Sequence, residues 1–163
     1  MNKEDIIQHL GLVAHQEGGY YVRTYQSPFD IETSRKSSKR ALLTSIYYLL
    51  TDDRPVGHFH INQSDIIHYF HAGSPITYLI VHPDGRLEKV AMGADLTKGQ
   101  LPQLIVKGGC WKASHLESGE FGLISEAVAP GFDYSDMELG SKTKLHAMFP
   151  HLSEVISRYT KDE

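Results

Sequence analysis

The chain has 163 residues, one cysteine and a formal net charge of −4 at pH 7. This length suits one domain with its own core, and the acidic balance argues against a nucleic-acid partner. A single cysteine excludes an internal disulfide, and no apolar run approaches the roughly 18 residues that a membrane-spanning helix needs. The first residues hold too short an apolar run for a signal peptide. We therefore expect one cytoplasmic domain, residues 1–163, with no nucleic-acid or membrane partner.

A short helix is predicted at residues 2–10. Asn2 suits the N-cap position, apolar residues recur at helical spacing as far as Leu10, and Gly11 is a typical helix stop. A glycine pair then breaks the pattern. Residues 20–25 are rich in aromatic and β-branched side chains, which predicts a first strand.

Short strand-like runs follow one another through the middle of the chain. Sequences rich in proline, glycine and aspartate separate them, which favours an all-β sandwich or barrel. The predicted strands are residues 42–50, 56–61, 66–71, 77–81, 87–92, 104–106, 110–115 and 121–128. Helical spacing returns only at residues 150–159. The basic cluster at residues 35–40 is expected on a solvated loop, and Asp136 at a solvated turn.

Potential metal ligands and proton carriers crowd into residues 57–73. They are His58, His60, Asp65, His68 and His71. Residues two apart on a strand share a face, so His58 and His60 should point the same way, with His68 joining them from the next strand. Two interpretations stay open at this point. The side chains either bind a divalent metal or form a polar lining without one.

Three motifs carry a resemblance to a known family. They are Glu17-Gly18-Gly19-Tyr20-Tyr21, the stretch from His60 through Ser64-Asp65 to Ala72-Gly73, and the run from Ala129 to Gly140. Together they resemble a small cupin-superfamily family of unknown function, the cupin-5 group. The resemblance implies an all-β, cupin-type jelly-roll barrel at about residues 17–140, a short N-terminal helix, a C-terminal helix and a homodimer. It also implies a barrel similar to those of deoxysugar-nucleotide epimerases.

The metal pattern that the cupin resemblance implies is incomplete in this chain. In the family register His60 takes the first histidine position, while Asn62 and Ile66 replace a histidine and a glutamate. Lys112 stands at the last histidine position, where its cation would oppose a metal. We therefore predict no cofactor, and keep a divalent metal as the alternative. The alternative ligand set is His58, His60 and Asp65.

Without a metal, proton transfer next to a carbonyl is the natural chemistry for such a barrel. His60 is the predicted base. The candidates for the acid are Tyr69, Tyr48 and Tyr21, and the candidates for holding a negatively charged group are Arg23 and Lys112. The predicted ligand-binding residues are Glu17, Tyr21, Arg23, Tyr48, His68, Trp111, Asp133 and Glu138. The expected function is an isomerase or epimerase acting on a sugar or sugar-nucleotide-like compound. The alternatives are a non-catalytic small-molecule-binding module and a metal-dependent oxygenase that uses His58 and His60.

Overall fold

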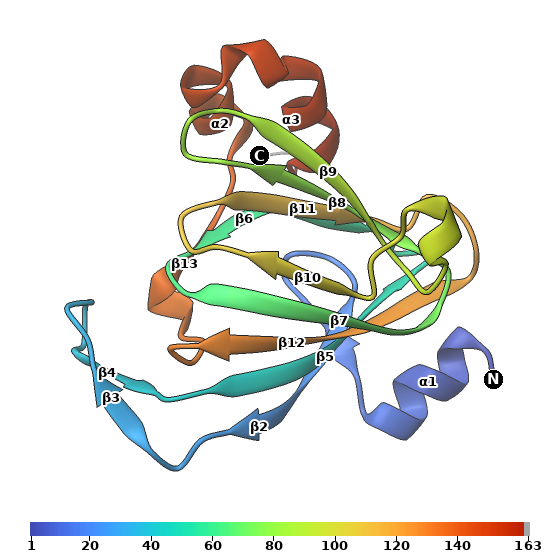
Figure 1. Ribbon diagram of the computed structural model, residues 1–163, viewed down its shortest axis with the longest axis horizontal. Helices are drawn as coiled ribbons and strands as arrows, with labels where there is room; N and C mark the ends of the chain where they lie inside the picture. The colour runs from blue at the N-terminus through green and yellow to red at the C-terminus, as the bar shows by residue number, and fades with distance from the viewer. Residues whose placement is uncertain (162–163) are drawn as a thin grey trace.

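Two antiparallel sheets face each other in the computed structural model, which describes residues 1–161 (Figure 1). The first sheet has the order β1 (Val13–Ala14), β2 (Tyr20–Gln26), β5 (Thr44–Thr51), β12 (Phe121–Ala129), β7 (Asp65–Gly73) and β10 (Gln103–Val106). The second has the order β13 (Met137–Leu139), β6 (Val56–Asn62), β11 (Trp111–His115), β8 (Ile76–Val81) and β9 (Leu87–Met92). A hairpin of β3 (Asp30–Glu32) and β4 (Lys39–Ala41) extends from the barrel. The predicted jelly-roll barrel is confirmed.

Strand alternation divides the apolar side chains between the barrel interior and its outer faces. On β5, Tyr48 and Leu50 point into the interior and pack with residues of the opposite sheet such as Ile80. Tyr47 and Leu49, one position away on the same strand, pack on the outer face. The apolar interior core fills one part of the barrel, and a cavity with polar side chains occupies another part.

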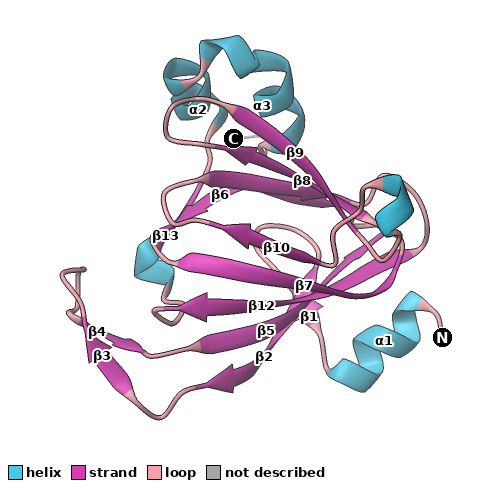
Figure 2. Cartoon of the chain, in the orientation of Figure 1, coloured by secondary structure: helices cyan, strands magenta, loops and turns pink. Residues whose placement is uncertain are grey.

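Helix α1 (Lys3–Leu10) covers the outer face of the first sheet (Figure 2). Its Ile6 is buried beside Leu49 of β5. Asn2 is the N-cap: its side chain accepts a hydrogen bond from the Asp5 N–H at 2.8 Å, and the Asp5 carboxylate accepts one from the Asn2 N–H at 3.1 Å. Gly11 ends the helix with a positive φ of 64°. The helix predicted at residues 2–10 is therefore confirmed.

Replacing Asn2 with alanine should lower the free energy of unfolding by about 1 kcal/mol, because the N–H of Asp5 loses its acceptor. Urea unfolding followed by circular dichroism measures this change. Gln8→Ala is the control, since Gln8 is exposed on the same helix. Equal unfolding midpoints for the two variants would show that the cap does not contribute.

Two helices cover the outer face of the second sheet, where one had been predicted. They are α2 (Lys142–Met148) and α3 (Ser153–Tyr159), joined by the short 3₁₀ helix η3 (Pro150–Leu152). Leu145 and Ile156 pack there against Phe59 of β6. The predicted helix at 150–159 thus corresponds to η3 and α3, whereas α2 was not predicted. Two further 3₁₀ turns are η1 (Leu96–Lys98) and η2 (Tyr134–Asp136).

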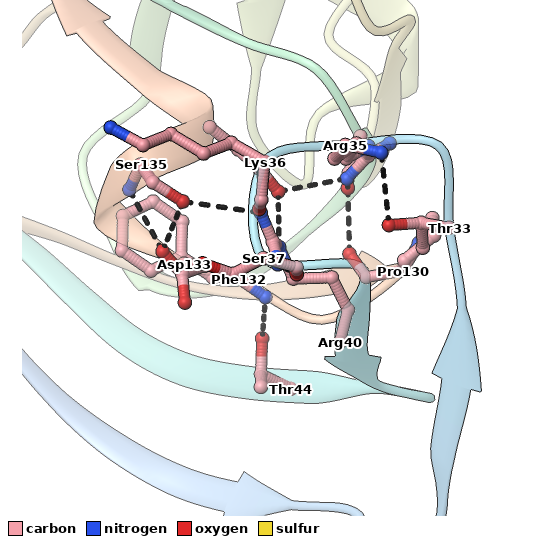
Figure 3. A network of polar contacts seen from close by, with 12 residues as sticks. Thr33, Arg35, Lys36, Ser37, Arg40, Thr44, Pro130, Phe132, Asp133 and Ser135 are labelled. Carbon is pink, nitrogen blue, oxygen red and sulfur yellow. Dashed lines mark hydrogen bonds and ion pairs between the residues drawn. The ribbon is translucent and has the colours of Figure 1, made fainter.

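The basic cluster at residues 35–40 is not a freely solvated loop. Arg40 is only 3% exposed, and its guanidinium donates to both carboxylate oxygens of Asp136, at 2.8 and 2.7 Å. Arg35 donates to Asp136 at 2.9 Å and to Ser64 at 2.7 Å. Figure 3 shows the surrounding network, in which Arg40 also contacts Ser135. The solvated position predicted for Asp136 was wrong, and within the basic cluster it holds for Lys36 and Lys39 but not for Arg35 and Arg40, whose partner Asp136 is remote in sequence.

None of the helices within residues 1–161 has the length and hydrophobicity required to span a lipid bilayer.

Candidate functional site

A cavity of about 470 Å³ opens into the barrel between the two sheets. Six buried polar side chains line it, and Glu126 of β12 adds a seventh, partly exposed one. The six are His15, Glu17, Thr44, Tyr48, His60 and Asn62. Exposed residues mark the mouth, where Arg23, Asp133 and Tyr134 lie. The cavity is therefore polar inside the barrel and open to solvent at one end.

The loop that carries Glu17 is held tightly against β5 and β6. Gly18 has a φ of 113°, and a Cβ there would come within 1.9 Å of the Val56 carbonyl oxygen, so only glycine fits. The Tyr48 hydroxyl donates to the Gly18 carbonyl at 2.9 Å, and the His58 N–H donates to the Glu17 carbonyl at 2.6 Å. These contacts fix the backbone, and the Glu17 carboxyl group reaches to 3.3 Å from Nε2 of His60.

The hydrogen bonds of two histidines determine what the Glu17 carboxyl group faces. His60 Nδ1 lies 2.8 Å from the His58 carbonyl and must carry the proton, which leaves a lone pair on Nε2. His15 Nδ1 accepts from the Glu17 N–H at 3.0 Å and lies 3.7 Å from the Glu17 Oε2. An ionised carboxylate would thus face two nitrogen lone pairs, whereas a protonated one donates a hydrogen bond to His60.

The pKa shifts of these groups agree with that hydrogen-bond assignment. Burial raises the pKa of Glu17 to about 8, despite an opposing effect of the Lys112 charge. Burial, reinforced by the Lys112 charge, lowers the pKa of His60 to about 3, and burial lowers that of His15 to about 4. At neutral pH the Glu17 carboxyl group is therefore mostly protonated and donates a hydrogen bond to neutral His60.

A second polar cluster lies beside the first and consists of Lys112, His68 and Glu126. The Lys112 ammonium donates to Nε2 of His68 at 2.6 Å and lies 3.4 Å from Oε1 of Glu126. Burial disfavours ionisation of Glu126, but the charge of Lys112 and the contact with His68 outweigh it and hold the pKa well below its usual range. Burial and the Lys112 charge also lower the pKa of His68. Glu126 is thus an ionised carboxylate inside the cavity.

Most of the predicted site residues come together in these two clusters. Residues that line the cavity are Glu17, Tyr21, Arg23, Tyr48, His60 and Asp133. Lys112 and His68 adjoin it through Glu126. Sequence reasoning missed His15 and Glu126. Glu126 had a readable signal, since it is a charged residue in an otherwise apolar strand on the same face as Ile124 and Val128.

Three predicted site residues do not reach the cavity. Tyr69 follows His68 on β7, so it faces the other side of the sheet. Trp111 is buried in the outer cluster beneath α2 and α3, with the Lys144 ammonium 5.6 Å from its ring centre. Glu138 is exposed and pairs with Lys144. The structure therefore places none of these three in a position to contact a molecule in the cavity.

The predicted metal set is not brought together either. Asp65 is exposed, where it binds Lys107 at 2.8 Å and the Gly108 N–H at 2.9 Å. The Nδ1 atom of His58 lies 2.9 Å from the Glu17 carbonyl oxygen. Within residues 1–161 no three His, Cys, Asp or Glu side chains are arranged to hold a metal ion. The inward-facing side chains that could bind a metal, His68 and Glu126, also contact the ammonium group of Lys112, whose charge would repel a metal cation. The residues present therefore do not fit a divalent metal.

Replacing Tyr48 with phenylalanine should remove the hydrogen bond that holds the Gly18 carbonyl and so loosen the loop of Glu17. We expect a loss of about 1 kcal/mol, or a melting temperature lower by about 2–4 °C. Differential scanning calorimetry measures the shift. Tyr47→Phe, on the outer face of the same strand, is the matched control, and an equal shift in both variants would contradict the role of the Tyr48 hydroxyl.

Comparison with known proteins places the chain in a family. The family model described as Cupin superfamily (DUF985) matches residues 4–140. An uncharacterized protein of Saccharomyces cerevisiae is 39% identical over 146 residues, which cover 82% of this chain and 72% of the yeast protein.

Solved structures agree with this assignment. A hypothetical protein from Leishmania major has a TM-score of 0.93 at 29% identity, covering 99% of this chain and 100% of that one. A crystal structure of a protein from Shewanella oneidensis has a TM-score of 0.91 at 37% identity, covering 100% and 99%. An oxalate decarboxylase, at 12% identity and a TM-score of 0.54 over 91% of this chain and 37% of that one, shares the fold alone. The chain belongs to the cupin-superfamily family DUF985.

Proposed function

We propose that this protein is an isomerase or epimerase that moves a proton next to a carbonyl group of a small polar, sugar-like compound without a metal. The observation that carries the proposal is the Glu17 carboxyl group, which is buried, lines the cavity and lies 3.3 Å from the unprotonated nitrogen of His60. Acid–base catalysts work best when their pKa lies near the operating pH. A pKa of about 8 meets that condition for Glu17.

The structure changes which residue we assign as the proton carrier. His60 was the predicted base, but its pKa of about 3 makes it a weak one. In our proposal ionised Glu17 takes the carbon-bound proton and returns it to the neighbouring carbon of the enediolate, while the hydroxyl proton moves to the former carbonyl oxygen, which completes an isomerisation. Epimerisation at the same carbon needs a second proton donor on the opposite face, and Tyr21 is the candidate in the cavity lining. His60 orients the carboxyl group by accepting its hydrogen bond. Glu126, as a fixed carboxylate, and Tyr21 would accept and donate hydrogen bonds to substrate hydroxyls.

Proton exchange with solvent tests the proposal directly. The protein is incubated in D₂O with aldoses, ketoses and a keto-deoxysugar nucleotide, and ¹H NMR follows deuterium entering at the carbon beside the carbonyl. The supporting result is incorporation that depends on the protein and disappears in Glu17→Gln. Metal-free buffers containing a chelator should leave the rate unchanged.

A non-catalytic binding module is the second candidate, and the mouth of the cavity favours it. Arg23 and Asp133 are exposed there, and the hydroxyls of Tyr21 and Tyr134 lie 3.3 Å apart. These groups suit recognition of hydroxyls and charges without chemistry. Saturation-transfer NMR signals from the same compounds, with no deuterium incorporation, would favour the binding module over the enzyme. The homodimer remains a prediction that light scattering can check.

A further inference from the structure

Lys112 is a buried cation whose surroundings are unusual for a lysine. Only 3% of the residue is exposed, and it lies on β11 directly opposite His60 of β6. Burying an ammonium group is costly unless other groups compensate its charge and bind its protons. Two side chains from the other sheet do so here, His68 of β7 and Glu126 of β12. The lysine therefore connects the two sheets across the interior.

The atoms that hold the ammonium group are metal-ligand atoms. His68 Nδ1 lies 3.2 Å from the Leu104 carbonyl and carries the proton, so the lone pair of Nε2 points to Nζ of Lys112. The other acceptor is a carboxylate oxygen of Glu126. An unprotonated imidazole nitrogen and a carboxylate oxygen are typical ligands of zinc.

The spacing of these two atoms matches that of ligands on one cation. His68 Nε2 and Glu126 Oε1 are 3.4 Å apart. Two ligands at about 2.1 Å from a tetrahedral zinc ion are separated by about 3.4 Å. With the His68 proton on Nδ1, both atoms accept hydrogen bonds and repel each other unless a positive group lies beside them. The Lys112 ammonium contacts both atoms and supplies that group.

We infer that the Lys112 ammonium is a built-in cation of this barrel, which occupies the position that a divalent metal would take between His68 and Glu126 and prevents metal binding. A shorter, neutral side chain at position 112 then leaves the ionised carboxylate of Glu126 and the lone pair of His68 Nε2 without a cation. Such a variant should bind zinc. The inference concerns the charge arrangement alone and stands whether or not the protein proves to be an isomerase.

The test compares zinc binding by four proteins: the wild type, Lys112→Ala, Lys107→Ala and the double variant Lys112→Ala/His68→Ala. Lys107 is the matched control because it is an exposed lysine that pairs with a carboxylate, Asp65. Affinity is measured by competition with a chromogenic chelator, and stoichiometry by elemental mass spectrometry after dialysis. Zinc is the probe because Zn²⁺ undergoes no redox chemistry in the protein.

We expect Lys112→Ala to retain zinc that the wild type loses in the same dialysis, because removal of the ammonium group frees two ligand atoms. Lys107→Ala should bind zinc as the wild type does, and the double variant should not show the increased zinc binding of Lys112→Ala. Two results would overturn the inference. One is a folded Lys112→Ala protein that binds zinc no better than Lys107→Ala, and the other is a wild type that binds one zinc ion tightly through His68.

A measurement on the wild type covers the case in which Lys112→Ala does not fold. Buried, hydrogen-bonded ammonium protons exchange slowly with water, so ¹⁵N–¹H NMR should detect the Lys112 ammonium group. His68→Ala should weaken or shift that signal, whereas Lys107→Ala should leave it unchanged. A Lys112 signal that is indifferent to His68 would contradict the inference as clearly as a failure to gain zinc.

Discussion

Replacing Glu17 with glutamine is expected to slow proton exchange by about 10²–10⁴-fold, the range typical for loss of a general acid–base group. Glutamine keeps the size of the side chain and can still donate a hydrogen bond to His60, but it cannot take up a proton. The fold should therefore remain intact. In the wild type the exchange rate should rise with pH and level off above about 8, because the ionised carboxylate is the base. The NMR exchange assay measures both effects.

The stability of the same variant gives a second, substrate-free test of Glu17. The pKa of Glu17 is raised from 4.5 to about 8 on folding, so the folded state binds more protons than the unfolded state between these values. Its stabilising contribution is fully present below pH 4.5 and is lost as the pH rises through 8. Glu17→Gln removes this loss, and its stability relative to the wild type should therefore increase by roughly 3 kcal/mol between pH 5 and pH 8.5.

Glu32→Gln is the matched control for both tests, since Glu32 is an exposed carboxylate on the β3–β4 hairpin. It should change neither the exchange rate nor the pH dependence of unfolding. An unaltered pH dependence in Glu17→Gln would mean that Glu17 is ionised in the folded protein. If Glu17→Gln changes the pH dependence of unfolding but not the proton-exchange rate, Glu17 is buried and protonated as described but is not the catalytic base.

The strands of the barrel were predictable because their pattern is local. Alternation on β5 assigns Tyr48 to the interior and Tyr47 to the outer face, and β5 was predicted to within two residues at its start and one at its end. Elements too short to show an alternating or helical pattern of apolar residues were not predicted. The strands β3, β4 and β13 have three residues each, and α2 has seven, so they are stabilised by their partners rather than by their own sequences.

The site was harder to predict because strand register decides which side chains share the interior. Trp111 and Lys112 are neighbours in the chain, yet one packs beneath the outer helices and the other reaches His68 across the barrel. His60 was found because the histidine spacing placed it on the inward face. The protonation state of His60 could not be predicted, because its contact with the His58 carbonyl and its closeness to Glu17 exist only in the folded protein.

For Asp136 the local sequence predicted exposure to solvent, but the residue is buried. A turn aspartate and a basic cluster each suggest solvent, but the two meet across 96 residues of sequence and bury each other. The hydrogen bond from Arg40, supported by Arg35, holds the pKa of Asp136 below its usual range even though burial opposes it. The contact fastens the loop at residues 33–40 to the segment that bears Phe132 and Tyr134, and both of these residues line the cavity.

Replacing Asp136 with alanine should therefore cost about 3 kcal/mol of stability, because Arg40 loses the carboxylate that compensates its charge. For a chain of this size that is a fall in melting temperature of about 6–12 °C. Calorimetry at pH 7 measures it, with Asp133→Ala as the control, since Asp133 is exposed and accepts hydrogen bonds from its neighbour Ser135.

The pH dependence separates this charge contact from simple packing. The pKa of Asp136 is lowered on folding, so its contribution is present above the ordinary pKa of 3.8 and disappears as the pH falls through the folded value. The difference in the free energy of unfolding between the wild type and Asp136→Ala should therefore become smaller below about pH 4. A difference that stays constant down to pH 2 would attribute the loss to packing. In either case we expect the variant to weaken binding of the proposed sugar-like compound, because the segment that lines the mouth of the cavity is no longer fastened to the barrel.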